Sequence, residues 1–137
     1  MKTTMKALLL SSCALLLAAA CGPPRERDYV VVDSSGTLVV DWTVDGVKDV
    51  SQCDQGGAAV VDVTVQTAGG ADAGEFQADC GAFSTSIDLP SGSYLATAVL
   101  VDGAGRQRTT PVDLNPFRIR GDDVLTTPID FPADSFL

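Results

Sequence analysis

The sequence contains no histidine among its 137 residues. This absence excludes a zinc site built on imidazole ligands and an imidazole base that would activate a nucleophile. The G-x-S-x-G signature of serine hydrolases is also missing. Four aspartates, Asp41, Asp45, Asp49 and Asp54, lie close together, but their spacing matches no EF-hand calcium loop. We therefore expect a protein that is not an enzyme and that holds no metal and no cofactor.

Basic residues are scarce as well. Nine Lys and Arg stand against 18 Asp and Glu, which gives a net charge of −9. Nucleic-acid binding needs a basic face, so we expect no nucleic-acid partner. Almost all of the acids are Asp rather than Glu, a choice that suits turns and the solvent faces of strands better than helices.

Long apolar segments are missing too. The longest apolar run, from Ala7 to Ala20, holds about 14 residues, whereas a membrane-spanning helix needs roughly 20. Lys2 and Lys6 precede this run and give it a positively charged start. The pattern predicts a helical signal peptide over residues 1–20 and therefore an exported protein.

The end of this segment, Ala18-Ala19-Ala20-Cys21, resembles the lipobox of bacterial lipoproteins. The family usually has Leu three positions before the cysteine, and here Leu17 stands four before it. The resemblance implies that Cys21 receives fatty-acid chains such as palmitate, becomes the mature N-terminus and anchors the protein to a membrane. Gly22 stands where an Asp would favour the inner membrane, so the resemblance points to the outer membrane and leaves open whether the domain faces the periplasm or the cell surface.

Two alternatives to lipidation at Cys21 stay open. Cys13 follows Leu10-Ser11-Ser12 and fits the box locally, but cleavage there would leave an apolar run on the mature protein. An ordinary cleaved signal would make Cys21 incidental. After the signal, residues 21–28 are polar and proline-bearing and are interpreted as a tether, and residues 29–137 are interpreted as one domain.

Two cysteines remain in that domain, Cys53 and Cys80. Exported proteins fold in an oxidising compartment, so an even pair predicts a disulfide bond. Free structural thiols are the alternative.

The domain shows a period of two rather than a helical period. Residues in Thr37–Val44, Ala58–Thr67 and Ser93–Asp102 alternate between apolar and polar side chains, and turn residues separate these runs. We expect a chain break at Asn115-Pro116 and no helix after the signal. Seven to eight short strands at this spacing predict an all-β fold, a single antiparallel β-sandwich.

The segment Leu89-Pro90-Ser91-Gly92-Ser93-Tyr94, followed by alternating apolar residues, resembles a tyrosine corner. This motif occurs in transthyretin-like, carboxypeptidase-regulatory-like and fibronectin-type sandwiches, where the ring packs in the core and the hydroxyl bonds a nearby backbone group. Trp42 on an early strand adds an immunoglobulin-like feature, but Ala96 stands where antibody domains have a cysteine. The resemblance implies a binding or spacer module.

Four arginines, Arg106, Arg108, Arg118 and Arg120, form two pairs with a spacing of two. If the chain doubled back at Asn115-Pro116, the pairs would meet in one basic patch for an envelope protein or an anionic glycan. The alternative is ordinary surface charge paired with Asp113 or Asp122.

Together these features predict a non-enzymatic, membrane-anchored lipoprotein of the cell envelope, with a structural or protein- or ligand-binding role. A carbohydrate-binding accessory domain is the second hypothesis, and an enzyme of unknown type is the third.

Overall fold

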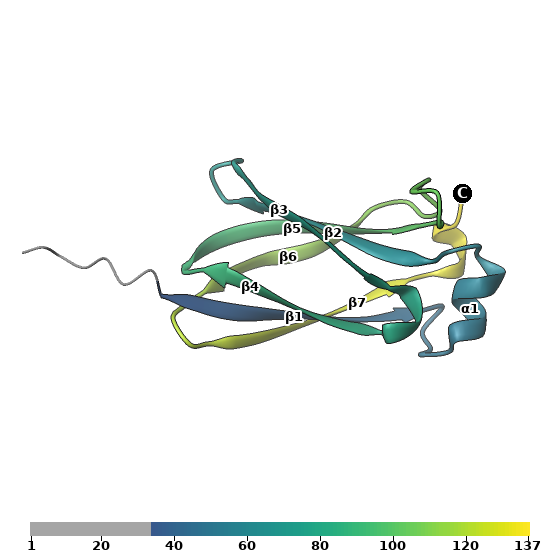
Figure 1. Ribbon diagram of the computed structural model, residues 1–137, viewed down its shortest axis with the longest axis horizontal. Helices are drawn as coiled ribbons and strands as arrows, with labels where there is room; N and C mark the ends of the chain where they lie inside the picture. Colours follow the sequence, from purple (N-terminus) through teal and green to yellow (C-terminus); the bar gives the residue numbers. More distant parts are fainter. Residues whose placement is uncertain (1–33) are drawn as a thin grey trace, which may run out of the picture. The chain divides into compact units, whose positions relative to one another are not determined.

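The computed structural model describes residues 34–137 (Figure 1). The expected signal peptide, Cys13, Cys21, the tether and the start of the expected domain at Tyr29 lie outside the described residues. The described part contains seven strands and one short helix: β1 (Ser35–Val44), α1 (Val50–Gln55), β2 (Val60–Thr67), β3 (Asp72–Asp79), β4 (Ser84–Pro90), β5 (Gly92–Val101), β6 (Val112–Ile119) and β7 (Val124–Phe131). Two 3-10 turns, η1 (Cys80–Ala82) and η2 (Ala133–Ser135), complete it. No helix within residues 34–137 is long and apolar enough to cross a membrane.

The strands form two packed sheets, in the orders β4-β1-β7 and β3-β2-β5-β6 (Figure 1). This arrangement confirms the predicted all-β sandwich. Four of the five strand pairings are antiparallel, but β1 and β7 run parallel, which the sequence did not predict. The reason is that β6 ends beside the start of β1, where the Asp123 carbonyl accepts the Thr37 N–H at 2.8 Å, so β7 begins at the same end as β1.

The core lies between the two sheets and follows the predicted alternation. Each strand turns every second side chain inward, and burial of these apolar groups is the main force that holds the sheets together. Fully buried residues include Leu38, Val40, Trp42 and Val44 of β1, Val61, Val63 and Val65 of β2, and Ala98 and Leu100 of β5.

The tyrosine corner is confirmed. The Tyr94 hydroxyl donates a hydrogen bond to the Pro90 carbonyl oxygen at 2.7 Å, and the Tyr94 ring stacks on Phe117 with 5.7 Å between ring centroids. The Trp42 indole N–H likewise donates to the Cys80 carbonyl oxygen at 2.8 Å. Both large aromatic residues therefore satisfy their polar atoms inside the core.

The expectation of no helix after the signal was wrong. The segment between β1 and β2 contains α1. This helix begins where the Asp49 carboxylate accepts a hydrogen bond from the Ser51 N–H at 2.9 Å. This bond lowers the pKa of Asp49, since it favours the charged form. At six residues α1 is too short to be stable alone, and tertiary contacts hold it in place.

The expected chain break at Asn115-Pro116 was also wrong. Strand β6 continues through both residues, and the pairing shifts from Tyr94↔Phe117 to Ala96↔Leu114, so that two residues of β6 face Leu95 alone. This is a β-bulge on the outermost strand of the sheet. Proline is accepted there because an edge strand has N–H groups that need no partner strand.

Candidate functional site

The predicted disulfide is present between Cys53 and Cys80, with 6.1 Å between the Cα atoms. It joins α1 to η1, and both cysteines are almost completely buried, at 2% and 1% exposure. The bond therefore has a structural role, since no partner can reach its sulfur atoms from solvent.

The first pair of arginines is engaged within its own region. The Arg106 side chain forms a salt bridge with Asp102, with 2.8 Å between Nε and Oδ2, and its backbone N–H lowers the pKa of Asp102. The Arg108 guanidinium donates to the Gly56 carbonyl oxygen at 3.0 Å. These two side chains hold the β5–β6 loop in shape and against the end of α1.

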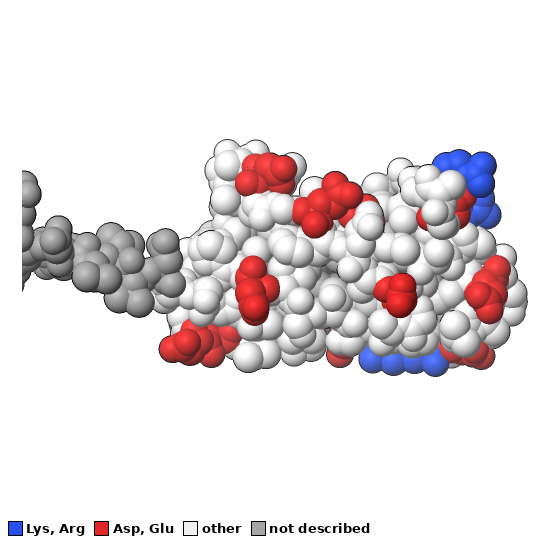
Figure 2. Space-filling model, in the orientation of Figure 1, with Lys and Arg blue, Asp and Glu red and all other residues white. Residues whose placement is uncertain are grey.

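The second pair lies at the opposite end of the same sheet. Arg118 near the end of β6 and Arg120 directly after it are exposed to solvent, and Arg118 pairs with Ser93 at the start of β5. Because β6 does not double back, about six residues of extended chain, roughly 20 Å, separate Arg118 from the beginning of β6. The four arginines therefore do not form one patch, and Figure 2 shows basic side chains at two separate places on a face with scattered acidic side chains.

A different feature stands out on the outer face of the four-stranded sheet. Leu95 of β5 is 42% exposed, although it lies in the interior of a sheet. It forms the floor of two adjoining hollows of about 130 and 360 Å³. We call this site the Leu95 groove. Its walls are Thr64 and Gln66 of β2, Thr97 of β5, and Asp113 and Pro116 of β6.

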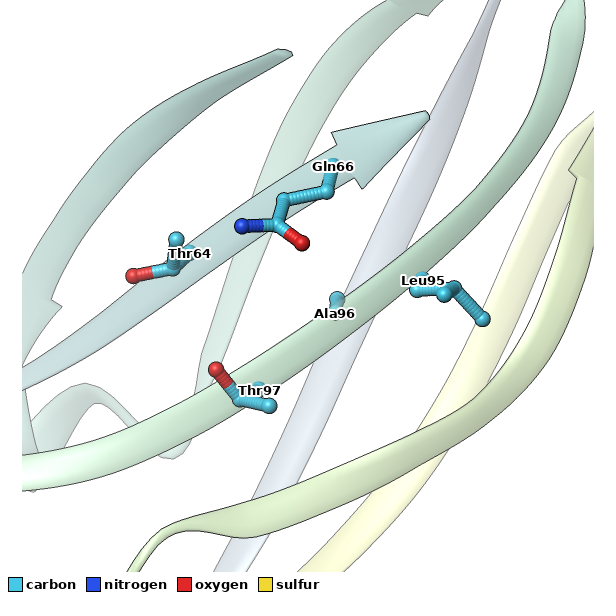
Figure 3. Close-up of a pocket in the computed structure, with 5 residues that line it drawn as sticks. All are labelled: Thr64, Gln66, Leu95, Ala96 and Thr97. Carbon is cyan, nitrogen blue, oxygen red and sulfur yellow. The ribbon is translucent and has the colours of Figure 1, made fainter. Parts of the chain in front are cut away.

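Strand register explains how the groove forms. Gln66 pairs with Leu95, and Thr64 pairs with Thr97, so these four side chains share the outer face. Figure 3 shows Thr64 and Gln66 on β2 beside Leu95, Ala96 and Thr97 on β5. The bulge in β6 opens the space on the other side of Leu95, because the two strands are out of regular pairing there.

An acidic group of side chains borders the groove on β2 and β3. Asp62 of β2 lies beside Gln77 of β3, whose Nε2 donates to Asp62 Oδ2 at 3.1 Å. A hydrogen bond with Asp62 and the negative charge of Asp62 raise the pKa of Glu75. The negative charge of Asp62 disfavours ionisation of the Glu75 carboxyl, because like charges repel.

The described residues give no support to sugar stacking or to metal chemistry. Trp42 and Tyr94 are buried, at 1% and 5% exposure, so neither offers an aromatic face to a ligand. Within residues 34–137, no three acidic or cysteine side chains gather in a way that could hold a metal ion.

The sequence matches no protein-family model and none of the curated proteins with which it was compared. Among solved structures, 71% of this chain aligns with 17% of the chain described as "The Bacillus anthracis TIE protein", with a TM-score of 0.47 and 16% sequence identity. The chain thus spans less than a fifth of that protein's length, and the identity is too low to relate the functions of the two.

Sequence reasoning missed the Leu95 groove. The sequence offers one weak signal, which is that Leu95 lies between the polar residues Ser93 and Thr97 on the outer face of β5. The hollow beside it depends on the bulge at Asn115 and Pro116, and a single chain segment does not reveal that pairing.

Proposed function

We propose that the protein is a non-enzymatic lipoprotein of the cell envelope, anchored to the outer membrane through lipid on Cys21, and that its β-sandwich binds a protein or other ligand in the Leu95 groove. The exposed leucine at the floor of a hollow is the observation that carries the binding role. A hollow lined by an apolar side chain together with a few hydroxyl and amide groups has the composition that ligand-binding sites share.

The anchoring role rests on the sequence. The apolar segment that ends in Ala18-Ala19-Ala20-Cys21 resembles the lipoprotein signal, and the buried disulfide supports export to an oxidising compartment. Stable anchoring needs two or more acyl chains, because each buried methylene contributes about 0.8 kcal/mol.

Metabolic labelling with a palmitate analogue tests the anchor. Label should be lost in Cys21→Ser and kept in Cys13→Ser, and Cys21→Ser should no longer fractionate with the outer membrane. The reverse pattern would move the anchor to Cys13, and unchanged labelling in both variants would remove it.

A pull-down of the lipidated protein from envelope extract tests the groove. We expect Leu95→Ser to lose the captured component, with Val124→Ser as the control, since Val124 is an exposed apolar residue of β7, on the other sheet. Capture that is the same for Leu95→Ser and the wild type would exclude the groove as the binding site.

A further inference from the structure

The Leu95 groove has carboxylates on both sides. One register row crosses the whole four-stranded sheet on its outer face, through Glu75 of β3, Thr64 of β2, Thr97 of β5 and Asp113 of β6. Adjacent strands are about 4.8 Å apart, so Glu75 and Asp113 stand roughly 14 Å apart with the two threonines between them. The Leu95 floor lies in the next row, between these two acidic ends.

These carboxylates have no cationic partner among residues 34–137. The one salt bridge in that part of the chain joins Arg106 to Asp102, in the loop beyond the end of β5. Asp62 accepts from Gln77 through one oxygen, its other oxygen is shielded from solvent, and the carboxyl group of Glu75 lies next to it within hydrogen-bonding reach. A cationic group placed here would pair with the exposed Glu75 carboxylate and would offset the repulsion between Glu75 and Asp62.

The apolar and acidic features are arranged at a spacing that an extended chain reproduces. In an extended segment, side chains at positions i, i+2 and i+4 share one face, and i and i+4 are about 13 Å apart. A basic side chain at each outer position would reach the carboxylates, and an apolar side chain at the middle position would cover Leu95. The net charge of −9 would also attract such a basic segment from solution.

We propose that the occupant of the Leu95 groove is an extended polypeptide segment that carries Lys or Arg on both sides of an apolar residue. This inference rests on the proposed binding role of the groove and specifies its partner. Asp62 and Glu75 receive the basic group at one end, Asp113 receives the other, and Leu95 with Pro116 contacts the apolar side chain.

Fluorescence anisotropy of a labelled peptide tests this proposal on the full lipidated protein in non-ionic detergent. The probe is Gly-Lys-Ser-Leu-Ser-Lys-Gly, compared with the same peptide carrying Glu in place of Lys and with one carrying Ser in place of Leu. We expect the Lys-Leu-Lys peptide to bind more tightly than either comparison peptide at low salt, and its affinity to fall as salt is raised.

Two double variants with the same change in charge separate the groove from the rest of the acidic surface. Asp62→Asn with Glu75→Gln should weaken binding about fivefold to tenfold, since it removes both negative charges at this end of the groove. Asp45→Asn with Asp54→Asn, next to and on α1, should leave binding within about twofold of the wild type because these carboxylates lie outside the groove. The fluorescence of buried Trp42 checks that each variant is folded.

Three results would overturn the proposal. Equal binding of the Glu peptide would exclude a basic partner. Equal loss in both double variants would mean unspecific attraction to an acidic domain. If Leu95→Ser loses the captured envelope component while Asp62→Asn with Glu75→Gln retains it, the groove keeps its binding role and only the basic character of its partner is wrong.

Discussion

Removal of the disulfide is the perturbation whose cost the structure defines most directly. Cys53 and Cys80 are 27 positions apart, so their bond closes a loop of 28 residues, counting both cysteines. In the chain-entropy account, this closure restricts the unfolded chain and stabilises the folded state by about 3.5 kcal/mol. Most of that loop is α1, β2 and β3.

For a domain of this size, a loss of about 3.5 kcal/mol corresponds to a fall of about 15 °C in Tm. The fall should be accompanied by local loosening of α1, which is short and is joined to η1 by the bond. The four-stranded sheet and the Tyr94 corner should persist, because neither uses the sulfur atoms for its contacts.

The assay is denaturant unfolding followed by fluorescence of Trp42, the single tryptophan of the chain. It is a sensitive probe because the ring is buried and its N–H bonds the Cys80 carbonyl. The variant is Cys53→Ala with Cys80→Ala, and the matched control is the wild type measured with and without reductant. A loss smaller than about 1 kcal/mol in both comparisons would refute the view that loop closure contributes to stability here.

Three further changes test other parts of the account. Tyr94→Phe should lower the free energy of unfolding by about 1 kcal/mol in denaturant titration, and an unchanged value would mean that the corner bond contributes nothing. Gly36→Ala should lower the free energy of unfolding by about 1–3 kcal/mol, because the new Cβ would lie 2.5 and 2.7 Å from two backbone carbonyl oxygens. Gly103→Ala is the control, since its Cβ would enter open space and should leave the free energy of unfolding unchanged. Folding raises the pKa of Glu75, so the stability from this group is present at low pH and is lost as the pH rises through the folded-state pKa. The free energy of unfolding of Glu75→Gln should therefore exceed that of the wild type by more at about pH 7 than at about pH 4. The same difference at both pH values would contradict the repulsion of Glu75 by Asp62.

The sequence by itself determined the features that depend on local alternation and on neighbouring residues. The period of two placed Leu38, Val40 and Trp42 on the inner face of β1, and the turn before Tyr94 placed its hydroxyl near the Pro90 carbonyl. The even cysteine count after the predicted signal peptide paired Cys53 with Cys80. These predictions succeeded because burial and hydrogen bonding of each residue follow from its position in its own strand or turn.

The tertiary structure alone decided which strands became neighbours and which side chains came together on the outer faces of the sheets. The parallel β1–β7 pair follows from where β6 ends, and the bulge at Asn115 and Pro116 follows from pairing with β5, so both depend on segments far apart in the chain. The unbroken course of β6 kept the four arginines apart, and its bulge opened the hollow beside Leu95. Register across four strands then brought Glu75 and Asp113 into one row, because hydrogen bonding between strands, rather than sequence distance, sets which side chains share a face.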